Sequence, residues 1–235
     1  MTGPVHVIVW GGGRTLAPRA VLVHGTMTGG YGRARLRRAA AAGRDGRALV
    51  VDRRGFGASP DVDRSDCELD AVDIAGLMEG GAHLVGHSYG GVVAMLAAAL
   101  ARMPAAIAEA PATTPRDWLR GSTEAVGMPP LDPTPARLRA AATAMRERPC
   151  WEADVPLDAL AAGRYPKLVI CGTWENAPAA YGEAAGEALM ACAAAVAREI
   201  GADLLRVEGA SHWPHAERPA VVNSALRRLW RRAAG

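Results

Sequence analysis

The stretch His83-Leu84-Val85-Gly86-His87-Ser88-Tyr89-Gly90-Gly91 decides the fold of this chain. A short apolar run comes before Gly86, and a longer apolar run with helical patterning follows the stretch. A serine at a tight strand-to-helix turn has a strained backbone and an exposed hydroxyl, and Gly86 and Gly90 supply the space that strand and helix need to cross. Because the context is right on both sides, the pattern predicts a nucleophile elbow at Ser88. An ordinary helix-capping serine is the alternative.

Short apolar runs of strand length alternate with helical patterns on both sides of this turn. The predicted strands cover residues 5–10, 20–24, 48–52, 83–85, 105–108, 167–171 and 204–207. The predicted helices cover residues 32–42, 69–78, 91–103, 181–200 and 219–232. Most of the strand runs are continuously apolar, as in strands that helices cover on both faces. The order of elements therefore predicts an α/β fold with a mostly parallel sheet.

Length and composition favour one folded domain and exclude several classes of partner. The chain has 235 residues, 50% hydrophobic and 22% charged, which excludes global disorder. Its net charge of +3, from 27 basic and 24 acidic residues, is too small to predict nucleic acid or a membrane surface as a partner. The four cysteines form no Cys-x-x-Cys pair, so neither a structural metal nor a disulfide framework is expected.

The beginning of the sequence lacks the pattern of a secretory signal, and no apolar run reaches the ~18 residues of a membrane span. We therefore expect a cytoplasmic protein with reduced thiols. Residues 112–165 break the alternation, since they are rich in Pro, Trp and charge and contain one helical pattern near residues 136–147. A long insertion of this kind is usually functional or a lid. We expect a single domain over residues 1–235 with residues 112–165 as a helical cap.

A serine hydroxyl becomes a nucleophile when a neutral imidazole takes its proton. Two histidines lie in Gly209-Ala210-Ser211-His212-Trp213-Pro214-His215, after the last predicted strand and before the last predicted helix. A loop at the carboxyl edge of a parallel sheet can bring an imidazole to Ser88. We expect His212 to be this base, and His215 to lie at the surface or to support it.

The third group is a carboxylate that orients the imidazole and stabilises its protonated form. Glu175 follows the predicted strand 167–171 and lies between the predicted nucleophile and base, the chain order expected for this architecture. We expect Glu175 to be this acid. Glu109, at the end of the preceding predicted strand, and Asp117 are the alternatives.

Backbone amides are expected to stabilise the oxyanion that develops when an acyl group is attacked. The amide of Tyr89, directly after the nucleophile at a helix start, is one candidate. The other is expected in the glycine-rich loop His24-Gly25-Thr26-Met27-Thr28-Gly29-Gly30, with Thr26 preferred over Met27.

The chain resembles the alpha/beta hydrolase superfamily in its small, single-domain form with a lid. The resemblance rests on the following stretches, which occur in the family's order: His24-Gly25, Asp52-Arg53-Arg54-Gly55-Phe56-Gly57-Ala58-Ser59, Gly86-His87-Ser88-Tyr89-Gly90-Gly91, Gly172-Thr173-Trp174-Glu175, and Gly209-Ala210-Ser211-His212 with Glu217-Arg218-Pro219 after it. It implies an eight-stranded sheet with helices on both faces, a triad of Ser88, Glu175 and His212, and a helical cap after the sixth strand. Most members carry Asp at the position of Glu175. Epoxide hydrolases and dehalogenases of this superfamily carry Asp at the elbow, so Ser88 argues against both activities.

These features predict a serine hydrolase that cleaves a carboxylic ester, thioester or related small-molecule acyl substrate through an acyl-enzyme, without a cofactor or metal. An apolar pocket is expected beside the triad. Its candidate residues are Met27, Trp118, Trp151, Trp174 and Trp213. Two other functions stay open: carbon–carbon bond hydrolysis, lyase or cyclase chemistry that uses the triad for proton transfer, and non-catalytic binding of a small molecule.

Overall fold

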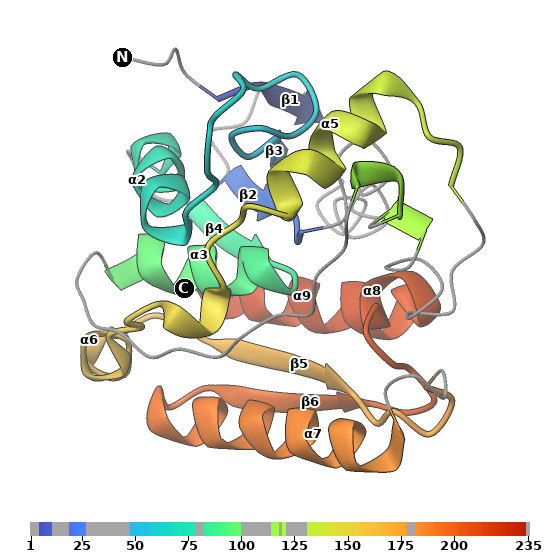
Figure 1. Cartoon of the computed structure of the whole chain (residues 1–235). Coiled ribbons are helices and arrows are strands. Elements are labelled where there is room, and N and C mark those ends of the chain that lie inside the picture. The colour runs from blue at the N-terminus through green and yellow to red at the C-terminus, as the bar shows by residue number, and fades with distance from the viewer. Residues whose placement is uncertain are drawn as a thin grey trace.

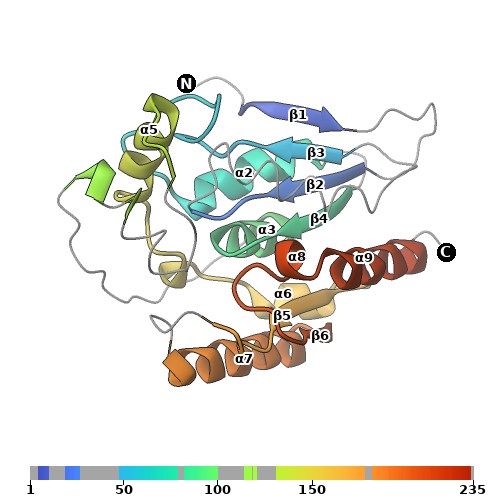
Figure 2. The ribbon, with the colours of Figure 1, turned by 90° about the vertical axis from the view of Figure 1, so that its right-hand side faces the viewer.

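Six strands form two sheets in the part of the chain that the computed structural model describes, which is residues 5–10, 19–26, 48–78, 82–99, 114–117, 119–120, 131–177 and 182–233. The strands are β1 (Val7–Trp10), β2 (Arg19–Val23), β3 (Ala48–Val51), β4 (Ala82–Gly86), β5 (Leu168–Gly172) and β6 (Asp203–Val207). The order is β1-β3-β2-β4 in the larger sheet, and β5 pairs with β6 in the smaller one (Figure 2). Only the pair β1 and β3 is antiparallel among these. The predicted mostly parallel α/β fold is therefore confirmed.

The strand predictions succeed because most of the strands are largely apolar runs that are buried or half-buried. All four residues of β3 are buried, for example. Six of the seven predicted strands are present within a residue or two of their predicted bounds. The seventh, at residues 105–108, lies outside the described residues, and the implied total of eight strands stays a prediction.

Among the described residues, helices lie between β3 and β4, between β4 and β5, between β5 and β6, and after β6 (Figure 1). They are α2 (Cys67–Leu77), α3 (Tyr89–Ala99), α5 (Pro135–Ala144), the 3₁₀ helix η1 (Cys150–Glu152), α6 (Leu157–Ala162), α7 (Gly182–Glu199), α8 (Pro214–Glu217) and α9 (Pro219–Ala233). The helix α2 begins earlier than the predicted residue 69 because the Asp66 side chain caps it by accepting from Glu68 N. The predicted helix at residues 32–42 lies outside the described residues.

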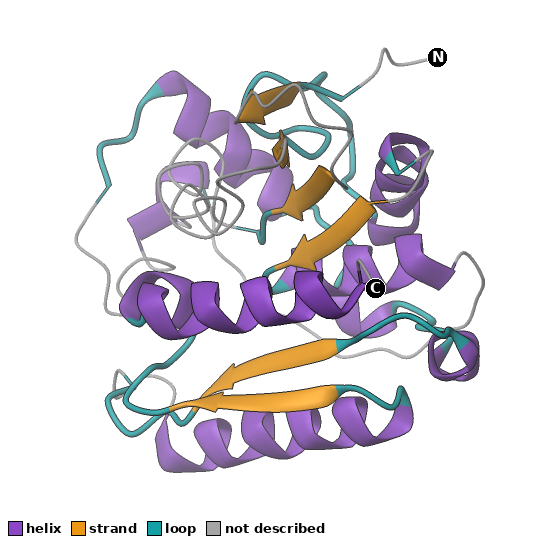
Figure 3. Ribbon diagram, turned by 180° about the vertical axis from the view of Figure 1, so that it is seen from behind, coloured by secondary structure: helices purple, strands orange, loops and turns teal. Residues whose placement is uncertain are grey.

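Helices cover both faces of the larger sheet. On one face α2 and α3 pack against alternate residues of β2 and β3, including Val21, Val23 and Leu49. On the other face α9 packs through Val222 and Leu226 against the residues of β4, β5 and β6 (Figure 3). This layering holds the strands in place, and the carboxyl ends of the parallel strands β2, β3 and β4 lie at one edge of the larger sheet.

The described part of the predicted cap is helical, with α5, η1 and α6. The helix α5 starts at Pro135 after its N-cap Thr134, close to the predicted residue 136. It packs against the loop that follows β3, where Phe56 is fully buried against Ala140 and Ala144. The helix α6 is an element that the sequence did not predict. No helix among the described residues has the length and apolar character needed to span a membrane.

Candidate active site

The loops that follow β4 and β6 meet at the carboxyl edge of the strands. His87, next to Ser88, donates from Nε2 to the backbone oxygen of His212 over 2.8 Å. The rings of His87 and His212 have centroids 5.1 Å apart. The predicted nucleophile and the predicted base therefore lie in two loops that are in direct contact.

Ser88 lies at the junction of β4 and α3 with a backbone φ of 55° and an exposed side chain. Positive φ is uncommon for a residue other than glycine. A Cβ on Gly86 would lie 2.1 Å from the carbonyl oxygen of Gly90, and one on Gly90 would lie 2.4 Å from the carbonyl oxygen of Val23. No side chain fits at either position, so both glycines are needed for the strained turn that exposes the Ser88 hydroxyl.

The loop after β2 approaches the Ser88 side chain at Gly25. A Cβ on Gly25 would lie 2.9 Å from Ser88 Cβ and 3.4 Å from Ser88 Oγ. The buried ring of His24 donates from Nδ1 to the carbonyl oxygen of Gly25 over 2.7 Å and so restrains this loop. Thr26 follows directly and is half-buried, whereas Met27 lies outside the described residues.

His212 lies among aromatic rings. The centroid distances from its ring are 5.1 Å to Trp213 and 6.0 Å to Trp174, and both tryptophans are buried. Burial lowers the pKa of His212 from its ordinary value, and the negative charge of Glu217 opposes this shift only in part. The imidazole is therefore neutral at neutral pH, as a general base must be.

Glu217 fixes the loop that carries His212. Its carboxylate accepts hydrogen bonds from Ser211 N at 2.8 Å, Ser211 Oγ at 3.1 Å and Trp213 N at 2.9 Å. In the sequence, Glu217 is noted only as part of the Glu217-Arg218-Pro219 stretch that resembles the family, and no role is predicted for it. A signal for the role exists in retrospect, because a Glu in the first turn of a helix can reach back to amides that precede the helix.

Glu175 lies in the turn after β5, directly after Trp174, whose φ is 64°. Its side chain is exposed, and Oε2 accepts from Gly209 N, in the loop of His212, over 3.0 Å. Of the two alternative acids, Asp117 accepts hydrogen bonds from Thr114 Oγ1 at 2.5 Å and from Arg120 at 3.2 Å. Glu109 lies outside the described residues.

The other candidate residues have separate locations. His215 lies beside the site, with its ring centroid 4.6 Å from that of His87. Trp151 lies in η1 and is 39% exposed, and Trp118 lies outside the described residues. No group of three or more His, Cys, Asp or Glu side chains within the described ranges is arranged to hold a metal ion.

The chain is an α/β protein in which a serine with positive φ lies between a parallel strand and a helix, and its neighbour His87 contacts a histidine-bearing loop from a later strand. The sequence pattern of the alpha/beta hydrolase family matches residues 20–225, and the chain belongs to this family.

Solved structures with low sequence identity share the fold. A thermophilic esterase from Thermogutta terrifontis is 22% identical, with 97% of this chain and 93% of that chain covered and a TM-score of 0.66. MenH from S. aureus is 12% identical, with coverage of 98% and 99% and a TM-score of 0.67. A meta-cleavage product hydrolase from Pseudomonas fluorescens is 16% identical, with coverage of 97% and 94% and a TM-score of 0.67. No curated protein sequence matches the chain.

Proposed function

We propose that this protein is a serine hydrolase that cleaves a carboxylic ester, thioester or related acyl substrate. Ser88 is the nucleophile, His212 the general base and Glu175 the acid that orients His212. The observation that carries the proposal is the strained turn at Ser88, whose neighbour His87 is hydrogen-bonded to His212. The lowered pKa of His212 supports its role as the base.

The reaction proceeds through an acyl-enzyme. His212 takes the proton of Ser88 Oγ as this oxygen attacks the acyl carbon. The backbone amides of Tyr89 and Thr26 stabilise the oxyanion, and the close approach of Gly25 to Ser88 supports this assignment for the loop after β2. The protonated His212 then gives its proton to the leaving group. His212 next takes a proton from water as the water attacks the acyl-enzyme. As the bond between the acyl carbon and Ser88 Oγ breaks, His212 gives this proton to Ser88 Oγ, and the carboxylic acid and free Ser88 are released.

Trp174 and Trp213 are proposed to line the acyl pocket, because both are buried beside His212. Met27, Trp118 and Trp151 stay pocket candidates from the sequence alone. The proposed partner is a small-molecule substrate, and the cytoplasmic location is proposed from the cysteine pattern.

Carbon–carbon bond hydrolysis is the second candidate activity, because one structure with the same fold is a meta-cleavage product hydrolase. In this reaction, or in lyase or cyclase chemistry on the same fold, Ser88 could act through proton transfer alone. Substantial turnover by Ser88→Ala would favour such chemistry over the acyl-enzyme. A ligand that binds and is recovered unchanged would indicate a non-catalytic binder.

The proposal is tested with a fluorophosphonate probe, mapping of the adduct by mass spectrometry, and a series of chromogenic esters with increasing acyl length. We expect a single adduct on Ser88, hydrolysis of at least the short esters, and loss of both in Ser88→Ala. His212→Ala should also lose labelling, because this variant has no base to activate Ser88. Labelling elsewhere, or ester turnover that survives Ser88→Ala, would overturn the assignment of the nucleophile.

A further inference from the structure

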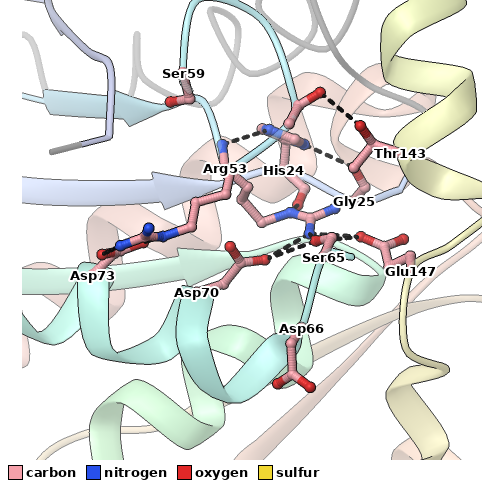
Figure 4. A network of polar contacts seen from close by, with 12 residues as sticks. His24, Gly25, Arg53, Ser59, Ser65, Asp66, Asp70, Asp73, Thr143 and Glu147 are labelled. Atoms are coloured by element: carbon pink, nitrogen blue, oxygen red, sulfur yellow. Dashed lines mark hydrogen bonds and ion pairs between the residues drawn. The ribbon is translucent and has the colours of Figure 1, made fainter. Parts of the chain in front are cut away.

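Arg53 forms a buried cluster with Ser65, Asp70 and Glu147 (Figure 4). The residue is 1% exposed, and its Nη1 donates to Asp70 Oδ2 at 2.7 Å and to Glu147 Oε1 at 2.6 Å. Ser65 Oγ accepts from the same nitrogen at 3.3 Å. Burial alone lowers the pKa of Arg53, but the charges of Glu147 and Asp70 raise it by more, so the guanidinium stays charged. The proposed catalytic steps use none of these groups.

On one side, Arg53 contacts a residue of each segment that is proposed to form the oxyanion hole: the backbone and ring of His24, and the ring of Tyr89. Arg53 Nε donates to His24 O, and Arg53 N donates to His24 Nε2, each over 3.1 Å. These bonds hold the end of β2 directly before Gly25 and Thr26. The guanidinium carbon also lies 4.3 Å from the ring centroid of Tyr89, the residue after Ser88. The Arg53 side chain thus contacts both segments that contain the proposed amide donors.

On the other side, the cluster contacts the predicted cap through Glu147. Glu147 follows α5, and its side chain is only 4% exposed. The adjacent Arg148 N donates to Ser65 O over 2.9 Å, and Thr143 Oγ1 in α5 donates to Gly55 O over 3.1 Å. The α5 segment is therefore seated on the loops before α2 and after β3. Displacement of this segment would remove Glu147 from Arg53.

We propose that Arg53 is a positioning residue that couples the seating of the α5 segment to the geometry of the oxyanion hole through its ion pair with Glu147. The inference rests on the proposed function, because it assigns Thr26 and Tyr89 as donors. Loss of one of its two carboxylate partners leaves this buried guanidinium only partly compensated, and we expect it to shift toward the partner that remains. Here Asp70 lies on α2, so Arg53 would move relative to His24 and take the loop of Gly25 and Thr26 with it.

Glu147→Gln tests the coupling, because it keeps the size of the side chain and removes its charge. The matched control is Asp73→Asn, which weakens the ion pair of Arg54 with Asp73. That pair has bonds of 2.6 and 2.7 Å and also joins the loop after β3 to α2, but it involves neither His24 nor the α5 segment. The substrate is the best chromogenic ester of the wild type, and a boronic acid inhibitor serves as the oxyanion mimic.

We expect Glu147→Gln to lower kcat by about 10- to 100-fold, since small misplacements of oxyanion donors have effects of this size, while KM changes less than about threefold. The inhibition constant of the boronic acid should rise in proportion to the loss of kcat. Hydrogen exchange should become faster in the peptide that carries Gly25 and Thr26. Asp73→Asn should change none of these three quantities, even where it lowers Tm.

Failure of the proposed function and failure of the coupling alone would give different results. A wild type that neither hydrolyses esters nor labels at Ser88 would contradict the proposed function, and with it the oxyanion assignment. An active wild type with a Glu147→Gln variant that matches Asp73→Asn in kcat, inhibition and exchange would contradict the coupling alone. If Glu147→Gln does not fold, the same three measurements are made on Glu147→Asp, which retains the charge with a shorter reach. A lower kcat with a proportional rise in the inhibition constant and faster exchange would support the coupling, and values equal to those of Asp73→Asn would contradict it.

Discussion

At the scale of single residues, the environment of His212 sets the pH dependence of the proposed reaction. Burial disfavours the charged imidazolium and lowers its pKa below the ordinary value of 6.5. The base is active when unprotonated, so kcat/KM should rise with pH and reach half its maximum below pH 6.5. Ester hydrolysis measured from about pH 5 to 9 checks this. A midpoint above 6.5, or a flat profile, would contradict His212 as the buried base.

The roles of Glu175 and Glu217 are separable by substitution, although both carboxylates bind the loop of His212. Glu175→Gln should lower kcat by about 10³- to 10⁴-fold with little change in Tm, because an acid that orients the base acts mainly on catalysis. Glu217→Gln should instead destabilise the fold by about 2 kcal/mol, because an amide replaces a carboxylate that accepts three hydrogen bonds. Steady-state rates and thermal unfolding of both variants check this. The reverse pattern would assign the orienting role to Glu217.

The candidate site residues that sequence reasoning can propose are those that lie in a contiguous motif, and their catalytic roles stay predictions. Ser88 is recognisable because its glycines and the flanking strand and helix are all local, and His212 because it follows the last strand. Arg53 and Glu147 are separated by 94 positions in the chain, and no local pattern marks them as partners. Their pairing results from the packing of α5 on the loop after β3, which the sequence predicted only as a cap.

At the scale of elements, periodicity predicts where the strands and helices lie, but local features such as caps and turns determine the residue at which a helix begins. The helix α2 begins at Cys67 because Asp66 supplies the cap, and α3 begins at Tyr89, two residues earlier than predicted, because the turn at Ser88 leads directly into it. The short helix α6 has only six residues, too few for a periodic pattern to be distinguished from a loop.

Gly25 lies where the loop after β2 approaches Ser88. Gly25→Ala should lower kcat/KM by about 100-fold, because the new Cβ lies 2.9 Å from Ser88 Cβ and 3.1 Å from His87 O, so the loop or the elbow must shift. Gly76→Ala in α2 is the control. Its Cβ meets no atom within 4 Å, and it should raise stability by about 0.5 kcal/mol without affecting the rate. Full activity of Gly25→Ala would show that the loop does not approach Ser88 in solution.

At the scale of the whole molecule, the site depends on packing that spans the chain. Strand ends from both sheets meet at one edge, the loop after β2 is held from below by Arg53, and α5 reaches the same cluster from the predicted cap. Hydrophobic clusters join α2 and α3 to one face of the larger sheet and α9 to the other. Protonation of a half-buried group packed between these layers should therefore affect the stability of the entire fold.

His83 in β4 is such a group, because its ring stacks on Trp230 of α9 with centroids 5.3 Å apart. Burial lowers the pKa of His83 below 6.5, so the unfolded chain binds a proton at a higher pH than the folded chain does. The free energy of unfolding should therefore be highest above pH 6.5 and fall as the pH decreases through the folded-state pKa. His83→Gln removes this contribution, and urea unfolding should show a smaller loss of stability between about pH 7.5 and 5 in the variant than in the wild type. Equal losses in both proteins would mean that His83 is protonated as easily in the folded chain as in the unfolded one.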